Sequence, residues 1–333
     1  MVMINGQGPV LGTTLFSLTN EWQQRLYSLE QMLAKVAALG LGPTVEVVGF
    51  QSLREFPDVS DTFAGYFRDL LARFGLTPSC LGGNSDVGRR KGRLMTPDEL
   101  LAYTERQIIS AAKLGFPVFR FQLSAGAAML ERLAPIGEKY GVHIACELHS
   151  PLAVDHPEVV EVRELFDRLR TPFLGFIPDF STSMTRIPDG YWGNLRRAGA
   201  PEGLIEVVKE IWHTDQPTSA KFGALAEARA WFGAGPAVMG QLNTVMTMFG
   251  RMPLEGWAQL LPYARHIHGK YYHVDESGCE PSIPYAELLA LLKRAGYHGT
   301  ISAEWEGQAF TEAPIGFEQV QRWHAMVKRL LAA

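Results

Sequence analysis

Short apolar runs alternate with longer amphipathic segments along nearly the whole chain, and this alternation restricts the fold more than any other feature. Helical spacing of apolar residues marks the longer segments, as in 22–40, 61–75 and 96–115. The runs that predict strands cover residues 9–17, 44–50, 77–83, 116–123, 143–148, 174–180, 266–273 and 300–305. Eight strands that alternate with helices predict an α/β fold, a (β/α)8 TIM barrel of parallel strands.

An open, doubly wound sheet is the alternative to a barrel. Such a sheet usually carries a glycine-rich phosphate loop after its first strand, and no such loop follows residues 9–17. The chain has 333 residues. Because barrels of this size commonly add insertions to one domain, we expect a single TIM-barrel domain over 1–333.

Four of the predicted strands end on side chains that bind metals. In chain order these strand ends supply Glu147, Asp179, His268 and Glu304. A charged group just past a buried strand is costly unless it is paired or binds something, and the strand ends of a barrel meet at one face. Two Glu, one Asp and one His predict a single site for a divalent ion such as Mn²⁺, with Mg²⁺ or Co²⁺ as alternatives.

The spacing of these strand ends is uneven. Asp179 and His268 are 89 residues apart, whereas 32 residues separate Glu147 from Asp179 and 36 separate His268 from Glu304. About 50 extra residues therefore lie between the sixth and seventh strands, at the end of the barrel where loops build sites. This insertion, residues 185–250, is rich in Gly, Met and aromatic residues. We expect a lid or a subunit interface, with a structural embellishment as the alternative.

Strand periodicity indicates which side chains share a face with the ligands. Residues two apart in a strand point to the same side, so His266, His268 and Lys270 share one face. His273 lies on the opposite face and is kept as the alternative ligand to His268. The same rule places His149 beside Glu147, Glu306 beside Glu304, and Arg120 beside Gln122.

These neighbours are candidates for catalysis and substrate binding. We expect His149 to be a general base, because imidazole titrates near neutral pH, with a purely hydrogen-bonding role as the alternative. Lys270 would pair with a ligand carboxylate or polarise the substrate. Arg120 and Gln122 would hold sugar hydroxyls or serve as polar layers of the barrel. Glu306 and, in the insertion, Asn243 are the remaining candidates for substrate binding.

Charge and cysteine content exclude several classes of protein. The net charge is −4, and the only basic cluster, residues 88–93, is most simply a solvated loop, so we expect no nucleic-acid partner. Cys80, Cys146 and Cys279 form neither a disulfide framework nor a zinc pattern, which favours a reducing cytoplasm. The start of the chain suggests no signal peptide, and we expect no membrane association.

The ordered set of strand ends resembles that of the xylose-isomerase-like proteins, the sugar phosphate isomerase/epimerase superfamily. That family carries Glu, Asp, His and Glu on strands five to eight, which match Glu147 in CELH, Asp179 in PDFS, His268 in HIHGK and Glu304 in SAEWEG. The segment from His268 to Lys270 resembles the family's His-x-Lys pattern. The resemblance implies metal-dependent proton abstraction next to a sugar carbonyl, as in isomerisation or epimerisation.

Three departures count against simple ketose epimerisation. Ketose 3-epimerases place a His three residues after the strand-six Asp, where this chain has Thr182. Their second catalytic Glu follows the first by six residues, where this chain has Ala153. The long insertion is also absent from the compact epimerases.

A narrower resemblance is to the large subunits of bacterial C-glycoside deglycosidases, carried by HIHGKYYHVDE, SIPY at 282–285 and EWEG at 304–307. It implies a metal-dependent lyase that cleaves the C–C bond between a 3-keto sugar and an aromatic aglycone. The steps would be α-proton abstraction, a metal-stabilised enolate and elimination. It also implies a small β-subunit partner and a larger oligomer. A ketose isomerase or 3-epimerase is the first alternative, a non-catalytic sugar-binding subunit the second, and a phosphodiester-cleaving barrel the least favoured.

Overall fold

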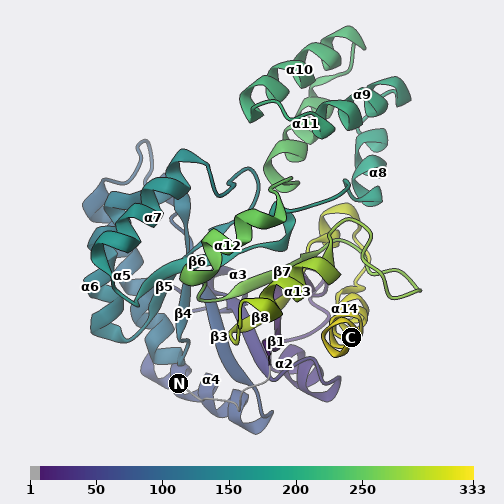
Figure 1. The fold of residues 1–333 in the computed structure, drawn as a ribbon. Coiled ribbons are helices and arrows are strands. Elements are labelled where there is room, and N and C mark those ends of the chain that lie inside the picture. Colours follow the sequence, from purple (N-terminus) through teal and green to yellow (C-terminus); the bar gives the residue numbers. More distant parts are fainter. Residues whose placement is uncertain (1–7) are drawn as a thin grey trace.

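Eight parallel strands form one curved sheet in the structure, a computed structural model that describes residues 8–333 (Figure 1). Hydrogen-bonded neighbours follow the order β6-β5-β4-β3-β2-β1-β8-β7. Single parallel bridges, Phe176 to Ala264 and Asp179 to His268, join the two edges into a near-closed barrel. The strands are β1 (Val10–Thr14), β2 (Thr44–Val48), β3 (Thr77–Gly82), β4 (Val118–Gln122), β5 (His143–Leu148), β6 (Leu174–Pro178), β7 (Ile267–Tyr271) and β8 (Thr300–Trp305).

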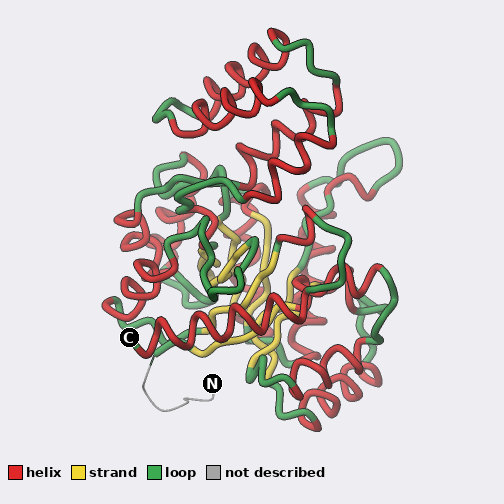
Figure 2. The backbone as a smooth tube through the Cα atoms, turned by 90° about the vertical axis from the view of Figure 1, so that its right-hand side faces the viewer, coloured by secondary structure: helices red, strands yellow, loops and turns green. Residues whose placement is uncertain are grey.

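Helices on the outside of the sheet connect successive strands, as the alternating pattern predicts (Figure 2). The longer ones are α2 (Leu29–Ala38), α4 (Asp61–Arg73), α5 (Pro97–Leu114), α6 (Ala127–Tyr140), α7 (Pro157–Leu169), α13 (Tyr285–Arg294) and α14 (Gly316–Ala332). Shorter ones are α1 (Thr19–Gln23), α3 (Gly49–Ser52) and α12 (Trp257–Leu260). Helix α5 begins with a capping box between Thr96 and Glu99 and ends at Gly115, whose φ of 87° suits glycine. The expectation of no signal peptide rests partly on residues 1–7, which lie outside the described residues.

Alternation along the strands separates an apolar layer inside the barrel from a polar layer at the strand ends. Cys80, Val118, Ala145 and Ile177 form a small buried cluster of their own. The last three each precede a charged residue by two positions, so Arg120, Glu147 and Asp179 lie on the same inner face, further toward the carboxyl ends. The apolar layer fills the barrel below, and the charged layer lies above it.

Strand β7 shows how close packing orients the ligands. A Cβ on Gly269 would lie 2.6 Å from the Trp323 ring of α14, so this residue faces outward against a helix. His268 and Lys270, its two neighbours, therefore face inward, as the periodicity predicts. His273 lies beyond the strand and is exposed.

Four helices between β6 and β7 form a separate layer beyond the strand ends. They are α8 (Asp189–Arg197), α9 (Glu202–His213), α10 (Thr218–Trp231) and α11 (Pro236–Met248). Figure 1 shows them projecting away from the barrel. They bury apolar side chains of their own, including Leu204, Val208, Trp212, Leu225 and Leu242. They occupy most of the insertion expected at 185–250.

The two ends of the insertion are joined at its base. The amide of Gly250 donates to the carbonyl of Ser181 (2.9 Å), the amide of Met252 to that of Thr182 (2.7 Å), and the amide of Met184 to that of Gly250 (2.8 Å). A Cβ on Gly250 would lie 2.7 Å from the Thr182 carbonyl, so the strands approach closely because this residue is glycine. The base of the insertion is therefore a short, tight antiparallel pair directly above the barrel.

Candidate metal centre

The four predicted ligands come together at the carboxyl ends of the strands. Glu147, Asp179, His268 and Glu304 each offer one donor atom, and these atoms lie within 4.8 Å of one another. Strands β5, β7 and β8 carry three of them, and Asp179 immediately follows β6. The side chains of Asp179 and His268 are almost fully buried. The structure therefore brings together in one cluster the four residues that the sequence predicts as metal ligands.

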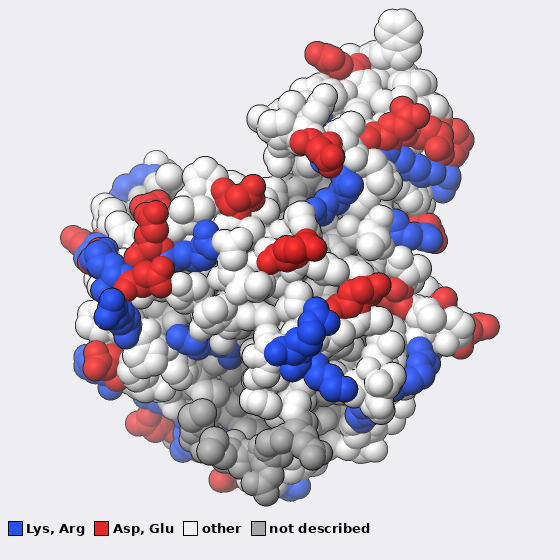
Figure 3. Space-filling view, viewed as in Figure 1, with Lys and Arg blue, Asp and Glu red and all other residues white. Residues whose placement is uncertain are grey.

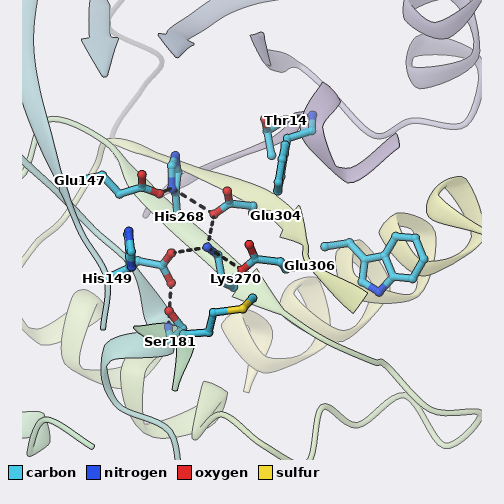
Figure 4. A network of polar contacts seen from close by, with 12 residues as sticks. Thr14, Glu147, His149, Ser181, His268, Lys270, Glu304 and Glu306 are labelled. Carbon is cyan, nitrogen blue, oxygen red and sulfur yellow. Dashed lines mark hydrogen bonds and ion pairs between the residues drawn. The ribbon is translucent and has the colours of Figure 1, made fainter. Parts of the chain in front are cut away.

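His268 and Lys270 are the cations of this cluster (Figure 4). The Nδ1 atom of His268 lies 2.8 Å from Glu147 Oε1 and 3.0 Å from Glu304 Oε2. The Nζ atom of Lys270 lies 2.9 Å from Asp179 Oδ2, 2.9 Å from Glu306 Oε2 and 3.5 Å from Glu304 Oε2. Lys270 thus contacts two of the ligand carboxylates and also Glu306.

The donor set fits a divalent ion. Among the described residues, Asp179 Oδ2 and Glu304 Oε2 are buried and accept no hydrogen bond of acceptable geometry, although Lys270 and His268 lie close to them. Buried carboxylate oxygens of this kind are costly unless a cation binds them. Three carboxylates and one imidazole are also ligands for a hard or borderline divalent ion.

Burial and charge act in opposite directions on these carboxyls. Burial raises the pKa of Asp179, and Glu304 adds to this rise while Lys270 opposes it. Burial also acts to raise the pKa of Glu147, but the charges of Arg120 and His268 hold it well below its usual range. The pKa of Glu304 is lowered in the same way, because His268 and Lys270 outweigh burial.

The two cations respond in the complementary way. Burial acts to lower the pKa of His268, but Glu304, Glu46 and Glu147 raise it well above its usual range. Burial likewise opposes the charge on Lys270, and the carboxylates around it raise its pKa. The carboxylates around His268 therefore favour the protonated form of its ring. Because a metal ligand must be unprotonated at the donor atom, ion binding would release a proton.

A fifth acidic residue, which the sequence reasoning missed, lies behind His268. Glu46 Oε1 lies 3.0 Å from His268 Nε2, and Glu46 Oε2 lies 2.9 Å from His266 Nε2. His266 Nε2 in turn lies 3.0 Å from Ser302 Oγ. The signal was available in the sequence, because Glu46 is the one acidic residue in the apolar run TVEVV.

Arg120 and Gln122 lie on the same strand but have different surroundings. Arg120 Nη1 donates to Glu147 Oε2 at 2.7 Å and lines the cavity above the cluster. Gln122 Oε1 accepts from the amide of Ser85 at 3.0 Å, so it fixes the loop after β3. Gln122 is not among the residues that line the cavity. Its expected contact with substrate stays a prediction.

A cavity of about 160 Å³ lies directly above the cluster. Its polar side is formed by Glu46, Arg120, Glu147, His149, Ser181, Lys270, Glu304 and Glu306. Its apolar side is formed by Phe16, Val48, Phe50 and Met248, and Phe50 is 61% exposed. The cavity therefore pairs a charged floor with an apolar, partly aromatic wall.

His149 lines this cavity, and one of its ring nitrogens contacts the backbone. Its Nδ1 lies 2.7 Å from the carbonyl oxygen of Ser150. Because a carbonyl can only accept, Nδ1 carries the hydrogen and Nε2 keeps its lone pair. His149 follows β5 and, like Glu147, lines the cavity. Asn243, in contrast, is exposed on α11 and does not line it, so its role stays a prediction.

Fold and site together define the chain as a xylose-isomerase-like barrel with a candidate divalent-metal centre. Solved structures of related fold agree with this class. They include an L-ribulose 3-epimerase (TM-score 0.56, 12% identity, 97% of this chain and 95% of that one). They also include a D-psicose 3-epimerase (TM-score 0.53, 12% identity, 97% and 100%). At these identities the likeness concerns the fold alone, and no family model matches the chain.

The chain belongs to the family of C-glycoside deglycosidase alpha subunits. A C-glycoside deglycosidase alpha subunit of Arthrobacter globiformis is 40% identical over 98% of this chain and 91% of its own length. A 3'-dehydrocarminate deglycosidase alpha subunit of a Microbacterium species is 36% identical over 97% and 95%. The resemblance found in the tail motifs is thus confirmed over almost the full length. Among residues 8–333, no helix combines the length and apolar character needed to cross a membrane.

Proposed function

We propose that the chain is the catalytic subunit of an enzyme that cleaves the C–C bond between a 3-keto sugar and an aromatic aglycone. The observation that carries this proposal is the cavity, in which an acidic ligand cluster faces Phe16, Phe50 and Met248. A charged floor suits the oxygen atoms of a sugar, and an apolar wall suits a flat aglycone. The names of the relatives supply the reaction class, a C-glycoside deglycosidase in one and a 3'-dehydro substrate in another.

Glu147, Asp179, His268 and Glu304 would hold the ion, with Mn²⁺ favoured and Mg²⁺ or Co²⁺ as alternatives. Bound there, the ion would supply Lewis-acid stabilisation of the negative charge that develops on the 3-keto oxygen. Lys270, paired with two of the ligand carboxylates, would keep them oriented and add a positive charge beside the same oxygen. Arg120 would orient Glu147.

His149 would begin the reaction by taking the proton from C2, which is acidic because it is adjacent to the ketone. Its protonated Nδ1 is occupied by the Ser150 carbonyl, so Nε2 is the atom that accepts the proton. The electrons of the C2–H bond then form the C1=C2 double bond of an enone as the bond from C1 to the aglycone breaks. The aglycone carbon takes up a proton, and the phenol ring helps by stabilising the developing charge.

The insertion would be the site at which a second subunit binds. The alpha-subunit naming of the relatives implies a second subunit, and we expect a small partner that docks on or near residues 185–250 within a hetero-oligomer. Ser181 and Met248, at the two ends of the insertion, both line the cavity. A partner bound to helices α8 to α11 would therefore act on the wall of the cavity through its rigid base.

A ketose isomerase or 3-epimerase is the second candidate, because the solved structures of related fold include ketose 3-epimerases. Thr182 and Ala153, where those enzymes carry His and Glu, count against it.

Two incubations with Mn²⁺ discriminate between the candidate functions. One uses a 3-keto C-glucoside and the other uses free ketoses, each with and without the partner. Released aglycone supports the proposal, whereas an epimerised or isomerised ketose without aglycone release favours the second candidate. Absence of both products and of tightly bound metal would indicate a non-catalytic sugar-binding subunit.

A further inference from the structure

A line of buried polar groups extends from the metal centre through Glu46, which also borders the cavity. His268, Glu46, His266 and Ser302 follow one another at distances of 3.0, 2.9 and 3.0 Å. The side chains of Glu46, His266 and His268 are only 1–2% exposed. None of these contacts is explained by the four ligands themselves.

Burial of Glu46 has a free-energy cost that must be offset. Its strand is otherwise apolar, and the neighbouring Val45 and Val47 are fully buried. Taking a carboxylate out of water costs several kcal/mol unless hydrogen bonds to both oxygens replace the lost hydration. Each oxygen of Glu46 indeed has its own imidazole partner. An apolar residue would fill this place in β2 more favourably, which argues for a functional reason.

The two ring nitrogens of His268 face different groups. Nδ1 faces the oxygens of Glu147 and Glu304, which are donor atoms of the centre. Nε2 faces Glu46. A carboxylate can only accept, so in the metal-free chain both nitrogens of His268 have a partner that accepts a hydrogen. Nδ1 is on the side of the other three ligands and would give up its hydrogen to bind an ion, while Glu46 keeps the hydrogen on Nε2. Metal-binding histidines commonly depend on such an outer carboxylate for tautomer and orientation.

We propose that Glu46 is a positioning residue that fixes the Nδ1-ligating tautomer of His268, and that His266 and Ser302 hold Glu46 in place. This inference rests on the proposed metal centre and adds to it a residue that is not one of the four proposed ligands. Loss of Glu46 leaves His268 free to rotate or to take the other tautomer. The ion is then bound more weakly even though all four ligands remain.

The competing interpretation is a second ion. Glu46, His266 and His268 also bring donor atoms within 4.8 Å of one another. With an ion there and another among the carboxylates, His268 would bridge two ions and lose both ring hydrogens. Metal stoichiometry separates the two cases. One ion per chain fits the positioning role, and two ions per chain, falling to one in Glu46→Gln, would overturn it.

The test uses Mn²⁺ alone, titrated into the metal-free chain and followed by electron paramagnetic resonance of the free ion. Glu46→Gln keeps the shape of the side chain, and Glu210→Gln, exposed on α9, is the matched control. We expect Glu46→Gln to raise the Kd for Mn²⁺ by roughly 10- to 100-fold at unchanged stoichiometry, and the control to leave it unchanged. Circular dichroism of the metal-free proteins checks that both variants fold.

A second measurement needs no change at Glu46. Histidine labelled with ¹⁵N in the unmodified chain, loaded with diamagnetic Mg²⁺, reports which nitrogen of His268 carries hydrogen. We expect hydrogen on Nε2 and none on Nδ1. Hydrogen on Nδ1, or an unchanged Mn²⁺ affinity in Glu46→Gln, would overturn the role of Glu46. If the unmodified chain binds no Mn²⁺ at all, the metal centre itself fails, which is a distinguishable result.

Discussion

At the residue scale, the difference between a ligand and a base depends on two positions of one strand. Glu147 faces His268 and Arg120 within the cluster, whereas His149 lies past the end of β5 and faces the cavity. Strand periodicity puts both on the inner face but cannot say which contacts the ion. The structure adds that Glu147 has its donor atom among those of Asp179, His268 and Glu304, whereas His149 is not part of that group.

Replacement of His149 tests the proposed base. We predict that His149→Phe lowers turnover by roughly 100-fold or more, because no other group takes the C2 proton, while Mn²⁺ content stays unchanged. Stopped assays of aglycone release and elemental analysis measure the two quantities. His298→Phe, an exposed site after α13, is the control. Full turnover in His149→Phe with normal metal content would reject the assignment.

Replacement of Phe50 tests the apolar wall. We predict that Phe50→Ala raises KM for substrates with an aromatic aglycone by roughly 10-fold and changes kcat less, because it removes contact area for the aglycone rather than a reacting group. Steady-state kinetics measure both constants. Leu94→Ala, which removes another exposed apolar side chain that does not line the cavity, is the control. An equal effect on an analogue that lacks the aromatic ring would contradict this role.

At the element scale, the candidate ligands could be predicted from the sequence, but the contacts of Glu46 with His266 and His268 could not. The four candidate metal ligands can be recognised in the sequence, because each is a charged or polar residue at the end of an apolar run. Glu46 lies in the middle of β2, and its partners are His268 of the distant β7 and His266, which immediately precedes β7. The single acidic residue in TVEVV was a signal, but only the barrel register shows what it contacts.

The contact between β1 and α14 should make stability depend on pH. Burial lowers the pKa of His324 to about 4 from 6.5, with Lys328 adding to the effect. The folded-state pKa is depressed, so the stabilisation is present above about pH 6.5 and is lost as pH falls through about 4. We predict that the free energy of unfolding falls over this range by up to roughly 3 kcal/mol more than in His324→Phe. Urea unfolding at several pH values measures it, and equal pH slopes would contradict it.

The insertion is attached to the barrel by Arg251. Its Nη1 donates to the carbonyls of His213 (2.6 Å) and Thr214 (3.2 Å) at the end of α9. Buried Lys221 donates to the carbonyl of Trp212 (3.1 Å) at the same helix end, beside a cavity of about 300 Å³. These two cations donate to backbone carbonyls at the end of α9. We therefore interpret this cavity as part of the junction between the insertion and the barrel.

Removal of Arg251 should loosen the insertion. We predict that Arg251→Ala speeds amide hydrogen exchange in α9 and α10 by roughly 5- to 10-fold, about 1 kcal/mol of local opening, and leaves the barrel strands unchanged. Hydrogen exchange with mass spectrometry measures this. Arg168→Ala, which removes a surface ion pair between Arg168 of α7 and Glu131 of α6, is the control. Faster exchange throughout the barrel would show that Arg251 stabilises the whole fold instead.

At the scale of the whole molecule, the alternation of strands and helices was enough to predict parallel strands and the place of the insertion. It could not predict that residues 185–250 contain four helices with buried side chains of their own, because such packing depends on contacts between distant residues. The surroundings of Gln122 and Asn243 show the same limit. The sequence does not reveal that Gln122 contacts the loop after β3 or that Asn243 is exposed, and their contact with substrate stays a prediction.

The surface charges indicate that substrate is recognised by contacts within the cavity rather than by long-range electrostatic attraction. On the face shown in Figure 3, acidic and basic side chains are interspersed over barrel and insertion. The basic loop at 88–93 is partly neutralised, since Arg90 and Arg93 both pair with Glu99. Paired surface charges of this kind do not steer a charged ligand strongly.

We expect an ion held by Glu147, Asp179, His268 and Glu304 to be required to break the bond between sugar and aglycone. The most direct test measures aglycone release from a 3-keto C-glucoside by the enzyme with its partner, before chelation, after chelation and after addition of Mn²⁺. We expect release to stop when the metal is removed, to return with Mn²⁺, and not to return in Asp179→Asn. Release that continues at full rate from metal-free protein would contradict it.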